Sequence, residues 1–421
     1  MKMQLPIMRA LFATGALFAF AACPAFPAAV SALSPADGAS VPLLKEEVKA
    51  YLAMDRAARK SFFSDEASRR RMYKWGDKPI PVTLKWTGPE HARYHVVVRR
   101  ETDGAVVFDE KTSKSEVEVW NLEMARAYSW NVTIEKGDAV GAGGRFHTED
   151  IAPRLVRVDG IPNIRDLGGR RGLGGRRVRQ GLVYRSAGLN NNANSYYTPE
   201  EVKKMLADGT LIDSVPEMSR DVATYIVRRN KVGKRVDLKH VVKKWHPGAE
   251  RLNAKTRAYM RETLGIKTDI DLRTDRECYG MTGSPLGEGV KWVHVSSSAY
   301  GGMAGAAAKT AFAQVFRVFL DEANYPLDFH CIAGADRTGS LAYILNALLG
   351  VEEDELWKDW EITGCRNSNL DFGHKTRFEK LVAVFEKYPG STPRERVEAY
   401  VKEQGFTDAD IAKFRNIMLE R

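Results

Sequence analysis

The residues with the clearest chemical potential lie in one run, Leu327-Asp328-Phe329-His330-Cys331-Ile332-Ala333-Gly334-Ala335-Asp336-Arg337-Thr338-Gly339. This order predicts a strand that ends at His330, a tight glycine-containing loop and a helix that begins at Thr338. The backbone N–H groups of such a loop converge on one point, which the positive end of the helix also faces. Arg337 adds a planar guanidinium that can hold two oxygens of a phosphate. We therefore expect a socket for a tetrahedral dianion, built by Ile332, Ala333, Gly334, Ala335 and Thr338 around Arg337.

Cys331 stands at the start of this socket. The loop amides, the helix dipole and Arg337 all favour its thiolate over its thiol. A thiolate that faces a bound phosphoryl group is placed to attack phosphorus. We expect Cys331 to form a phosphocysteine, which water then hydrolyses without a metal ion or other cofactor. Arg337 and the loop amides would stabilise the equatorial oxygens, and Thr338 could hydrogen-bond the departing sulfur.

The oxygen that leaves phosphorus needs a proton, which a positioned carboxylic acid can supply. Asp336 is the best candidate for this acid, although its carboxylate could equally serve to order the loop. Asp275 and Asp166 are weaker candidates. We expect His330 to order the loop rather than to act as a base, because a thiolate needs none. Arg165 and Asp166 are expected to support the loop.

The surrounding sequence indicates an α/β domain that holds the run in place. From Leu155 onwards, predicted strands alternate with predicted helices, which is typical of a parallel-containing central sheet flanked by helices. A long polar stretch from Asn190 to Arg251 has no clear core pattern, and we interpret it as an insertion, either a lid or a docking surface. The predicted strands and helices include Thr268–Leu272, Lys291–Val295, Lys309–Ala323, Leu327–His330 and Thr338–Leu349.

The run around Cys331 resembles the signature loop of the bacterial cysteine-dependent protein tyrosine phosphatases, which reads H-C-x-A-G-K-D-R-T-G. The resemblance covers about Pro153 to Arg421, and it implies an α/β phosphatase fold and hydrolysis of phosphotyrosine. Further segments resemble landmarks of that group in the same order, namely Asn163–Gly169, Gly181–Ser186, Leu264–Arg273 and closing helices that include Glu398–Tyr400 and Gly405–Leu419.

Two departures from the pattern bear on substrate and mechanism. Ala335 stands where the group usually has a lysine that is associated with highly charged substrates such as phosphoinositides. The loop from Ser296 to Gly302 has no carboxylate, although relatives often supply an acid from such a loop. An inositol phosphate or phosphoinositide phosphatase remains the first alternative, and a non-catalytic module that binds phosphorylated ligands is the second. A rhodanese-like sulfur transferase is disfavoured by the loop spacing.

Residues 33–150 predict a separate all-β domain. Short runs with alternating hydrophobic residues, separated by turn residues, are typical of an antiparallel sandwich. Leu122 and Tyr128 have the spacing of a tyrosine corner, and the segment resembles an immunoglobulin or fibronectin type III domain. A helical pattern at Leu43–Tyr73 would be an insertion between its first two strands. We interpret this domain as a spacer or docking module, followed by the catalytic domain at 151–421.

Residues 1–32 resemble a secretory signal peptide, with Lys2 and Arg9 before a short apolar run. Val30-Ser31-Ala32 could be a cleavage site for soluble export to the periplasm or the medium. Phe20-Ala21-Ala22-Cys23 instead resembles a lipoprotein box, so contact with a membrane is expected only through a lipid on Cys23.

Composition sets wider limits. The 421 residues are 44% hydrophobic and 28% charged, which excludes a disordered chain and a polytopic membrane protein. The net charge of +10 predicts an anionic partner, but no nucleic-acid-binding motif accompanies it, so we expect a phosphorylated protein, peptide or small monoester. An arginine-rich turn at Gly168–Gly175 is expected near the mouth of the site. The physiological substrate and the oligomeric state stay open.

Overall fold

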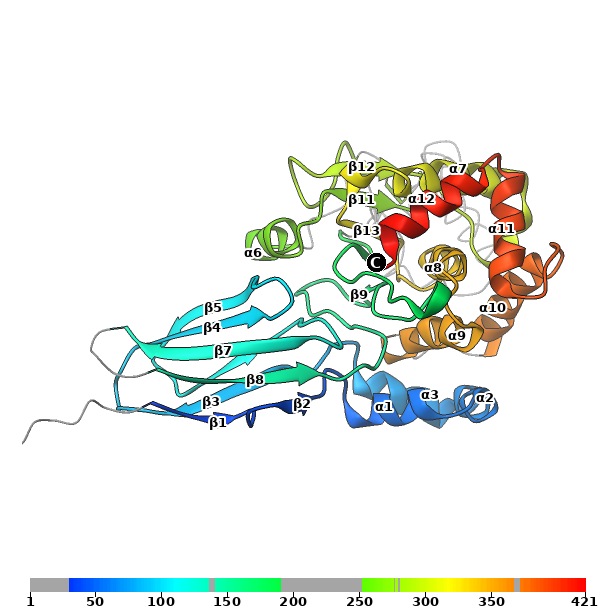
Figure 1. Cartoon of the computed structure of the whole chain (residues 1–421). Helices are drawn as coiled ribbons and strands as arrows, with labels where there is room; N and C mark the ends of the chain where they lie inside the picture. Colours follow the sequence, from blue (N-terminus) through cyan, green and yellow to red (C-terminus); the bar gives the residue numbers. More distant parts are fainter. Residues whose placement is uncertain (1–29, 136–140, 191–251, 276, 279–280, 367–371) are drawn as a thin grey trace, which may run out of the picture.

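The structure is a computed structural model that describes residues 30–135, 141–190, 252–275, 277–278, 281–366 and 372–421. An elongated β lobe meets one side of a larger lobe of strands and helices (Figure 1). The lipoprotein box at Cys23, most of the signal peptide and most of the segment 190–251 lie outside the described residues, so these assignments stay predictions.

The larger lobe has a mixed five-stranded sheet in the order β12-β11-β13-β10-β9. All neighbouring strands are parallel except β9, which runs antiparallel to β10. This arrangement with flanking helices agrees with the predicted α/β fold. The elements are β9 (Arg165–Asp166), β10 (Val183–Ser186), α6 (Ala254–Ala258), β11 (Thr268–Asp271), β12 (Lys291–His294), α7 (Ala306–Phe319), β13 (Leu327–His330), α8 (Arg337–Leu348), α9 (Glu353–Glu361), α10 (Phe372–Phe385), α11 (Pro393–Glu403) and α12 (Asp408–Met418).

The strand and helix that flank Cys331 lie at the centre of this lobe. All four residues of β13 are buried between β10 and β11. Helix α8 is mostly apolar, and every residue from Thr338 to Leu348 is buried, as expected for a helix enclosed by other elements. The chain therefore passes from a fixed strand to a fixed helix through a loop at the carboxyl edge of the sheet, where ligands of open α/β sheets bind.

The β lobe consists of two sheets, which share one hydrophobic core. In β3, Val82, Leu84 and Trp86 point into that core, as the alternation in the sequence predicts. The elements are β1 (Ser31–Ser34), β3 (Val82–Thr87) and β6 (Glu116–Val119) in one sheet, and β2 (Ala39–Val41), β8 (Ala142–Thr148), β7 (Ala127–Ile134), β4 (Tyr94–Arg100) and β5 (Val106–Thr112) in the other.

The predicted tyrosine corner has the expected contact. The backbone N–H of Glu123 donates to the Tyr128 hydroxyl at 2.9 Å, five residues upstream of the tyrosine. Relationship to fibronectin type III domains itself stays a prediction.

The folded β lobe begins earlier than the sequence analysis places it. Ser31 and Ala32 pair with Thr87 and Trp86 of β3, and Val30 is buried in the core. Cleavage after Ala32 would remove half of β1. The predicted boundary at residue 32 therefore divides a strand, which favours a fold that starts by Val30.

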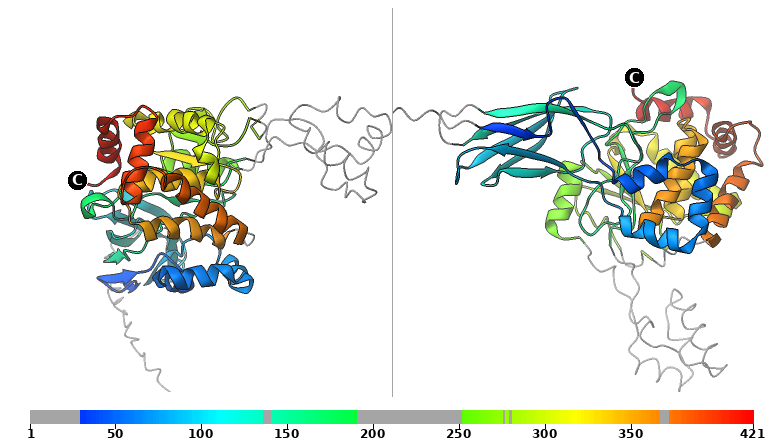
Figure 2. Two further views of the ribbon diagram at one scale, coloured as in Figure 1. Left: turned by 90° about the vertical axis from the view of Figure 1, so that its right-hand side faces the viewer. Right: turned by 90° about the horizontal axis from the view of Figure 1, so that it is seen from below.

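The predicted helical insertion forms three helices, α1 (Glu46–Ala53), α2 (Arg56–Ser64) and α3 (Glu66–Trp75). The breaks have local causes, because Asp55 and Asp65 cap the N-termini of α2 and α3 by accepting from the backbone of Ala58 and Ser68, each at 2.8 Å. The three helices extend beyond the β lobe and lie against α9 of the larger lobe (Figures 1 and 2).

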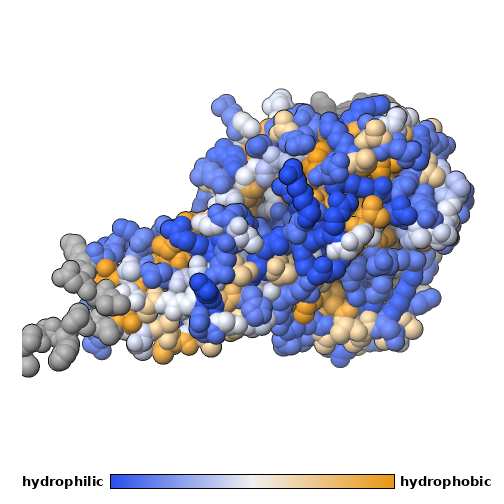
Figure 3. All heavy atoms as spheres, viewed as in Figure 1, coloured by the Kyte–Doolittle hydropathy of each residue, from blue (hydrophilic) through white to orange (hydrophobic). Residues whose placement is uncertain are grey.

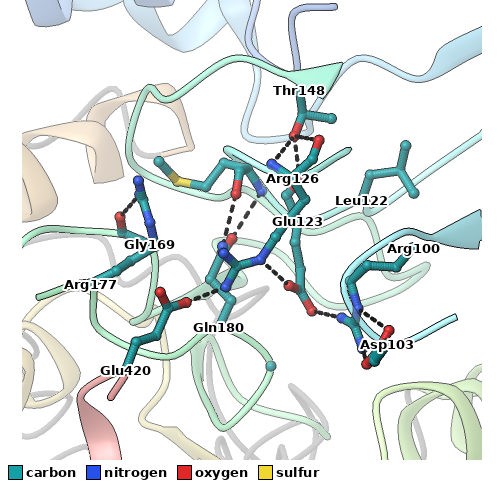
Figure 4. Close-up of polar contacts among 12 residues, drawn as sticks. Arg100, Asp103, Leu122, Glu123, Arg126, Thr148, Gly169, Arg177, Gln180 and Glu420 are labelled. Carbon is teal, nitrogen blue, oxygen red and sulfur yellow. Dashed lines mark hydrogen bonds and ion pairs between the residues drawn. The ribbon is translucent and has the colours of Figure 1, made fainter. Parts of the chain in front are cut away.

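The two lobes are also joined by a network of charged and polar side chains (Figure 4). Arg126 of the β lobe pairs with Glu123 and with Glu420 near the C-terminus. Gln180 makes hydrogen bonds to both the backbone N–H and the backbone carbonyl of Met124, each at 2.9 Å. A cavity of about 810 Å³ lies at this junction, and no residue of the run at 327–339 lines it. Among the described residues, no helix is long and apolar enough to span a membrane.

Candidate active site

The signature loop, Cys331 to Asp336, connects β13 directly to α8. Cys331 is buried, whereas the next residue, Ile332, is 42% exposed. Gly334 has φ +67°, and a Cβ at this position would lie 2.6 Å from the backbone oxygen of Ser186. Only glycine fits both the backbone conformation and this close approach, so Gly334 fixes the turn that brings the loop amides together.

Arg337, the first residue of α8, is held by Glu277 from the segment that follows β11. The guanidinium donates to the two carboxylate oxygens of Glu277 at 2.6 and 3.3 Å, and to the backbone oxygen of Leu272 at 3.3 Å. Burial alone raises the pKa of Glu277, but the hydrogen bond and charge of Arg337, together with hydrogen bonds from Thr274, keep the pKa below its ordinary value. The ionised carboxylate can therefore hold the fork in one orientation.

The carbonyl side of the signature loop is held from below by two side chains. Arg185 of β10 donates to the backbone oxygen of Gly334 at 2.6 Å, and Asn163 donates to that of Ala333 at 3.0 Å. Burial and the neighbouring Arg165 lower the pKa of Arg185 to about 10. With their carbonyl oxygens bonded underneath, these peptides can direct their N–H groups toward the ligand side.

Both supporting side chains converge on α9. Arg165 donates to an Asp359 carboxylate oxygen at 3.1 Å and to Asn163 at 2.6 Å, and Arg185 pairs with the other oxygen of Asp359. Burial by itself raises the pKa of Asp359, but Arg165, Arg185 and Arg170 hold it well below its ordinary range. Arg165 can therefore support the signature loop indirectly, because it binds Asp359, which also binds Arg185. The sequence did not indicate a role for Asp359.

Asp166 lies on the other side of the same two-residue strand. Its carboxylate pairs with Arg154 at 2.7 Å and accepts from the backbone of Gly168 and Gly181 at 2.8 and 2.6 Å. These partners lie toward the junction with the β lobe, and the structure gives Asp166 no contact with the signature loop. The expectation that Asp166 supports that loop, or supplies its acid, is not met by this position.

Asp336 sits at the N-terminus of α8, and its carboxylate accepts a hydrogen bond from the Tyr300 hydroxyl at 2.7 Å. Tyr300 comes from the loop after β12 that lacks a carboxylate. Trp360 of α9 donates to the same hydroxyl at 3.4 Å. Burial, followed by the charge of Asp336, raises the pKa of Tyr300, so the phenol remains a donor. Asp275, the weaker candidate acid, is 89% exposed and lies near His294.

These observations agree with the comparisons with known proteins. A family model described as "Tyrosine phosphatase family" matches residues 156–204 and 220–420. The chain belongs to the tyrosine phosphatase family. Only residues 205–219 fall between the two matched parts, whereas the sequence pattern predicts an insertion at about 190–251.

Two individual proteins resemble this tyrosine phosphatase family member. A Cupriavidus necator protein, predicted to be a tyrosine-protein phosphatase, is 31% identical over 220 residues, which are 51% of this chain and 65% of the relative. The match thus spans less than two thirds of that relative. The core catalytic domain of the PP-IP phosphatase SIW14 from S. cerevisiae, solved with citrate, has a TM-score of 0.26 and 17% identity, covering 40% of this chain and 88% of that one.

Two further residues of the family run have defined environments. Thr338 is fully buried, and its hydroxyl oxygen has no hydrogen-bond partner among the described residues. Ala335 is also buried. Within the described part of the chain, no three His, Cys, Asp or Glu side chains are grouped so that they could hold a metal ion.

The arginine-rich turn at Gly168–Gly175 does not lie at the mouth of the site. The backbone N–H of Leu173 donates to the oxygen of Leu349 at 2.8 Å, just beyond the C-terminal end of α8. A helix of this length is about 18 Å long, and the signature loop is at its other end. Arg177 instead pairs with Asp150. Figure 3, drawn in the view of Figure 1, shows hydrophilic residues over much of the surface where the two lobes meet.

His330, at the end of β13, is buried between two carboxylates. Its Nε2 lies 2.9 Å from Asp269, and its Nδ1 lies 3.8 Å from Asp271. Burial alone would lower the pKa of His330, but Asp271 and Asp269 raise it to about 9. The imidazole is therefore charged at neutral pH, which suits the ordering role predicted for it and not that of a base.

This ion cluster predicts a pH dependence of stability. Since the pKa of His330 is raised by folding, its contribution is full below the unfolded value of about 6.5 and is lost as pH rises through about 9. We expect the free energy of unfolding to fall by up to about 3 kcal/mol between about pH 7 and 9.5. Urea unfolding across this pH range measures the free energy of unfolding. His294→Asn is the control, in which the dependence of this free energy on pH should be the same as in the wild type. An equal slope in His330→Asn would contradict the assignment, and an imidazole NMR titration of the wild type reports the same pKa if that variant does not fold.

Proposed function

We propose that this protein hydrolyses phosphate monoesters through a phosphocysteine on Cys331. The observation that carries the proposal is the arrangement of the signature loop. Cys331 directly follows the buried strand β13, helix α8 begins at Arg337 at the other end of the loop, and the Arg337 guanidinium is held by both oxygens of Glu277. A dianionic phosphoryl group is the ligand that suits such a combination of backbone amides, helix dipole and guanidinium fork.

The first half of the reaction transfers the phosphoryl group to sulfur. The Cys331 thiolate attacks phosphorus, an S–P bond forms and the ester P–O bond breaks. Asp336, in its acid form, gives its proton to the departing oxygen. Arg337 and the loop amides hold the three equatorial oxygens, where charge gathers in the transition state.

The second half restores the enzyme. A water molecule attacks the phosphocysteine, gives its proton to the Asp336 carboxylate, and the S–P bond breaks to release inorganic phosphate and the thiolate. The Thr338 hydroxyl, which has no other partner among the described residues, is available to hydrogen-bond the departing sulfur.

Phosphotyrosine is the substrate that we propose. Ile332, beside the nucleophile, is one of few large hydrophobic residues that are exposed in the described part of the chain. An exposed aliphatic side chain at this place suits the aromatic ring of a phosphotyrosine better than the polyanionic ring of an inositol phosphate. Ala335 supplies no charge where a lysine would bind further phosphates.

A panel of substrates tests this function. Phosphate release is measured from phosphotyrosine peptides, phosphoserine peptides and inositol phosphates, with and without EDTA. We expect the phosphotyrosine peptide to be hydrolysed fastest and EDTA to have no effect. A preference for inositol phosphates would overturn the proposed substrate class. Inhibition by EDTA would overturn the metal-free mechanism. Binding of the substrates without release of phosphate would overturn the enzymatic function.

The acid role of Asp336 predicts a dependence on the leaving group. Asp336→Asn cannot donate the proton, so turnover of phenyl phosphate, a poor leaving group, should fall by about 10²–10⁴-fold. Turnover of p-nitrophenyl phosphate should fall much less, since its phenolate leaves without protonation. The ratio of the two rates in wild type and variant is the measurement. An equal loss on both substrates would assign Asp336 to loop ordering alone.

A further inference from the structure

The three helices of the insertion do not pack on the β lobe alone, because their inner face is buried against α9 of the larger lobe. Tyr51, Phe63 and Met72 belong to the same hydrophobic core as the helices around the signature loop. The rings of Phe63 and Trp360 lie 5.7 Å apart, and Met72 and Phe63 line the close approach at Gly364. In the left view of Figure 2 the blue helices of the insertion lie below the orange helices, and in the right view, seen from below, they lie in front of them.

A buried ion pair anchors this contact. Arg59 of α2 is fully buried and donates from Nε to the Glu361 carboxylate at 2.8 Å, while both of its terminal nitrogens donate to the Asp354 carboxylate. The Tyr51 hydroxyl donates to the same Glu361 oxygen at 3.0 Å. Glu361, at the C-terminal end of α9, thus receives two hydrogen bonds from the insertion.

The two residues that precede Glu361 are the ones that reach the site. Asp359 binds Arg165 and Arg185, and Arg185 holds the Gly334 carbonyl. Trp360 donates to the Tyr300 hydroxyl, which in turn donates to Asp336. Three successive residues of α9 therefore have different partners. Asp359 contacts the residues that support the signature loop, Trp360 contacts the tyrosine bonded to Asp336, and Glu361 contacts the insertion.

A second contact reaches the loop from the segment after α3. Asp77 accepts from the backbone N–H of Asn163, whose side chain donates to the Ala333 carbonyl at 3.0 Å. Lys78 donates to the backbone oxygen of Ile161 at 2.8 Å. The N-terminal segment is therefore connected to the signature loop by two sets of contacts, one through α9 and one through Asn163.

From these contacts we propose that the helical insertion α1–α3 is a positioning element of the active site. Through Glu361 it sets the place of Asp359 and Trp360, and through them the place of the Gly334 carbonyl and of Asp336. The catalytic unit then includes residues of the N-terminal half, rather than beginning at residue 151. This proposal extends the proposed function, and it depends on that function wherever turnover is the quantity measured.

A pair of matched substitutions on α2 tests the proposal. Arg59→Gln removes the buried cation that holds Glu361, whereas Arg56→Gln removes an exposed pair with Glu353 of the same helix α9. Because misplacement of catalytic groups by about 1 Å can cost about 10²-fold, we expect Arg59→Gln to lower kcat by about 10- to 100-fold. Arg56→Gln should retain the wild-type kcat.

The readouts must separate positioning from loss of fold. Turnover is measured at a temperature where circular dichroism shows each variant folded, together with the ratio of phenyl phosphate to p-nitrophenyl phosphate rates. If Asp336 is displaced, Arg59→Gln lowers this ratio, which a smaller folded fraction would not do. If Arg59→Gln does not fold, Tyr51→Phe removes a single hydroxyl and should shift kcat and the ratio in the same direction by less.

Binding of inorganic tungstate, a tetrahedral oxyanion, gives a readout that needs no turnover. We expect calorimetry to show about tenfold weaker binding in Arg59→Gln and unchanged binding in Arg56→Gln. If the wild type binds tungstate but hydrolyses no substrate, the proposed function is wrong. The comparison of tungstate affinities between the variants still tests whether the insertion positions the phosphate-binding loop. A folded Arg59→Gln variant that matches Arg56→Gln in kcat, rate ratio and tungstate binding would overturn the role of the insertion.

Discussion

Cys331→Ser is expected to lower the turnover of phosphotyrosine peptides by about 10⁴-fold or more. The substitution exchanges sulfur for oxygen with little change in size, so Gly334, Arg337 and Glu277 can still form the socket. A serine hydroxyl, unlike a thiol, stays protonated at neutral pH even beside a helix N-terminus and a guanidinium. The nucleophile is lost while the binding site is kept.

The measurement pairs steady-state kinetics with tungstate binding. Tungstate affinity should stay within a few-fold of the wild type, since the loop amides and Arg337 remain. Cys365→Ala removes another buried thiol from the same lobe and should keep most of the activity. Comparable activity in Cys331→Ser and Cys365→Ala would contradict a nucleophilic role for Cys331.

Arg337→Lys is expected to lower kcat by about 10²–10³-fold, comparable to the loss of a donor that stabilises a transition state. A lysine keeps the positive charge but has no planar fork, so it cannot bind two phosphoryl oxygens and both oxygens of Glu277 together. The loss should therefore appear in kcat as well as in KM, because the equatorial oxygens gain charge in the transition state.

Arg394→Lys on α11 is the matched control, since Arg394 is partly exposed and pairs with the nearby Glu395 and Glu398. It should change kcat by less than about twofold, as is usual for a surface pair. If Arg337→Lys also changes kcat by less than about twofold, a positive charge at position 337 is sufficient for turnover. The bidentate geometry of the guanidinium would then have no role in catalysis.

The sequence predicts the local geometry of the site because a strand, a glycine turn and a helix follow one another within the run at 327–339. The residues that orient this run come from elsewhere in the chain. Glu277 follows β11, Tyr300 follows β12, and Asp359 lies on a helix after α8. Each is an ordinary polar residue in its own segment, and only the strand order β11-β13-β10 and the packing of α9 bring it to the loop.

Asp166 shows how adjacency in sequence can mislead. Arg165 and Asp166 look like a pair, but successive side chains of a strand point to opposite faces. Strand β9 therefore sends Arg165 to Asp359 beneath the signature loop and Asp166 to Arg154 near the β lobe. The charges of the arginine-rich turn are also used within the fold rather than by a ligand, because Arg170 pairs with Asp359 and Arg171 pairs with Asp150.

The helical insertion shows the limit of periodicity. Its pattern predicts a helix with an apolar face, and the structure has three shorter helices in this segment. The pattern does not say which surface that face covers. Arg59, a charged residue in a polar helix, is the central contact, and its burial depends on Glu361 and Asp354 from a segment about three hundred residues later.

The central claim, a covalent phosphocysteine on Cys331, is tested most directly by trapping the intermediate. The wild-type protein is mixed with a phosphotyrosine peptide, quenched within milliseconds and digested, and the fragment that contains Cys331 is weighed by mass spectrometry. We predict that this fragment carries one phosphoryl group, that no other fragment does, and that the modification is absent from Cys331→Ser. Rapid turnover with an unmodified Cys331 fragment, or with phosphate on a different residue, would contradict the mechanism.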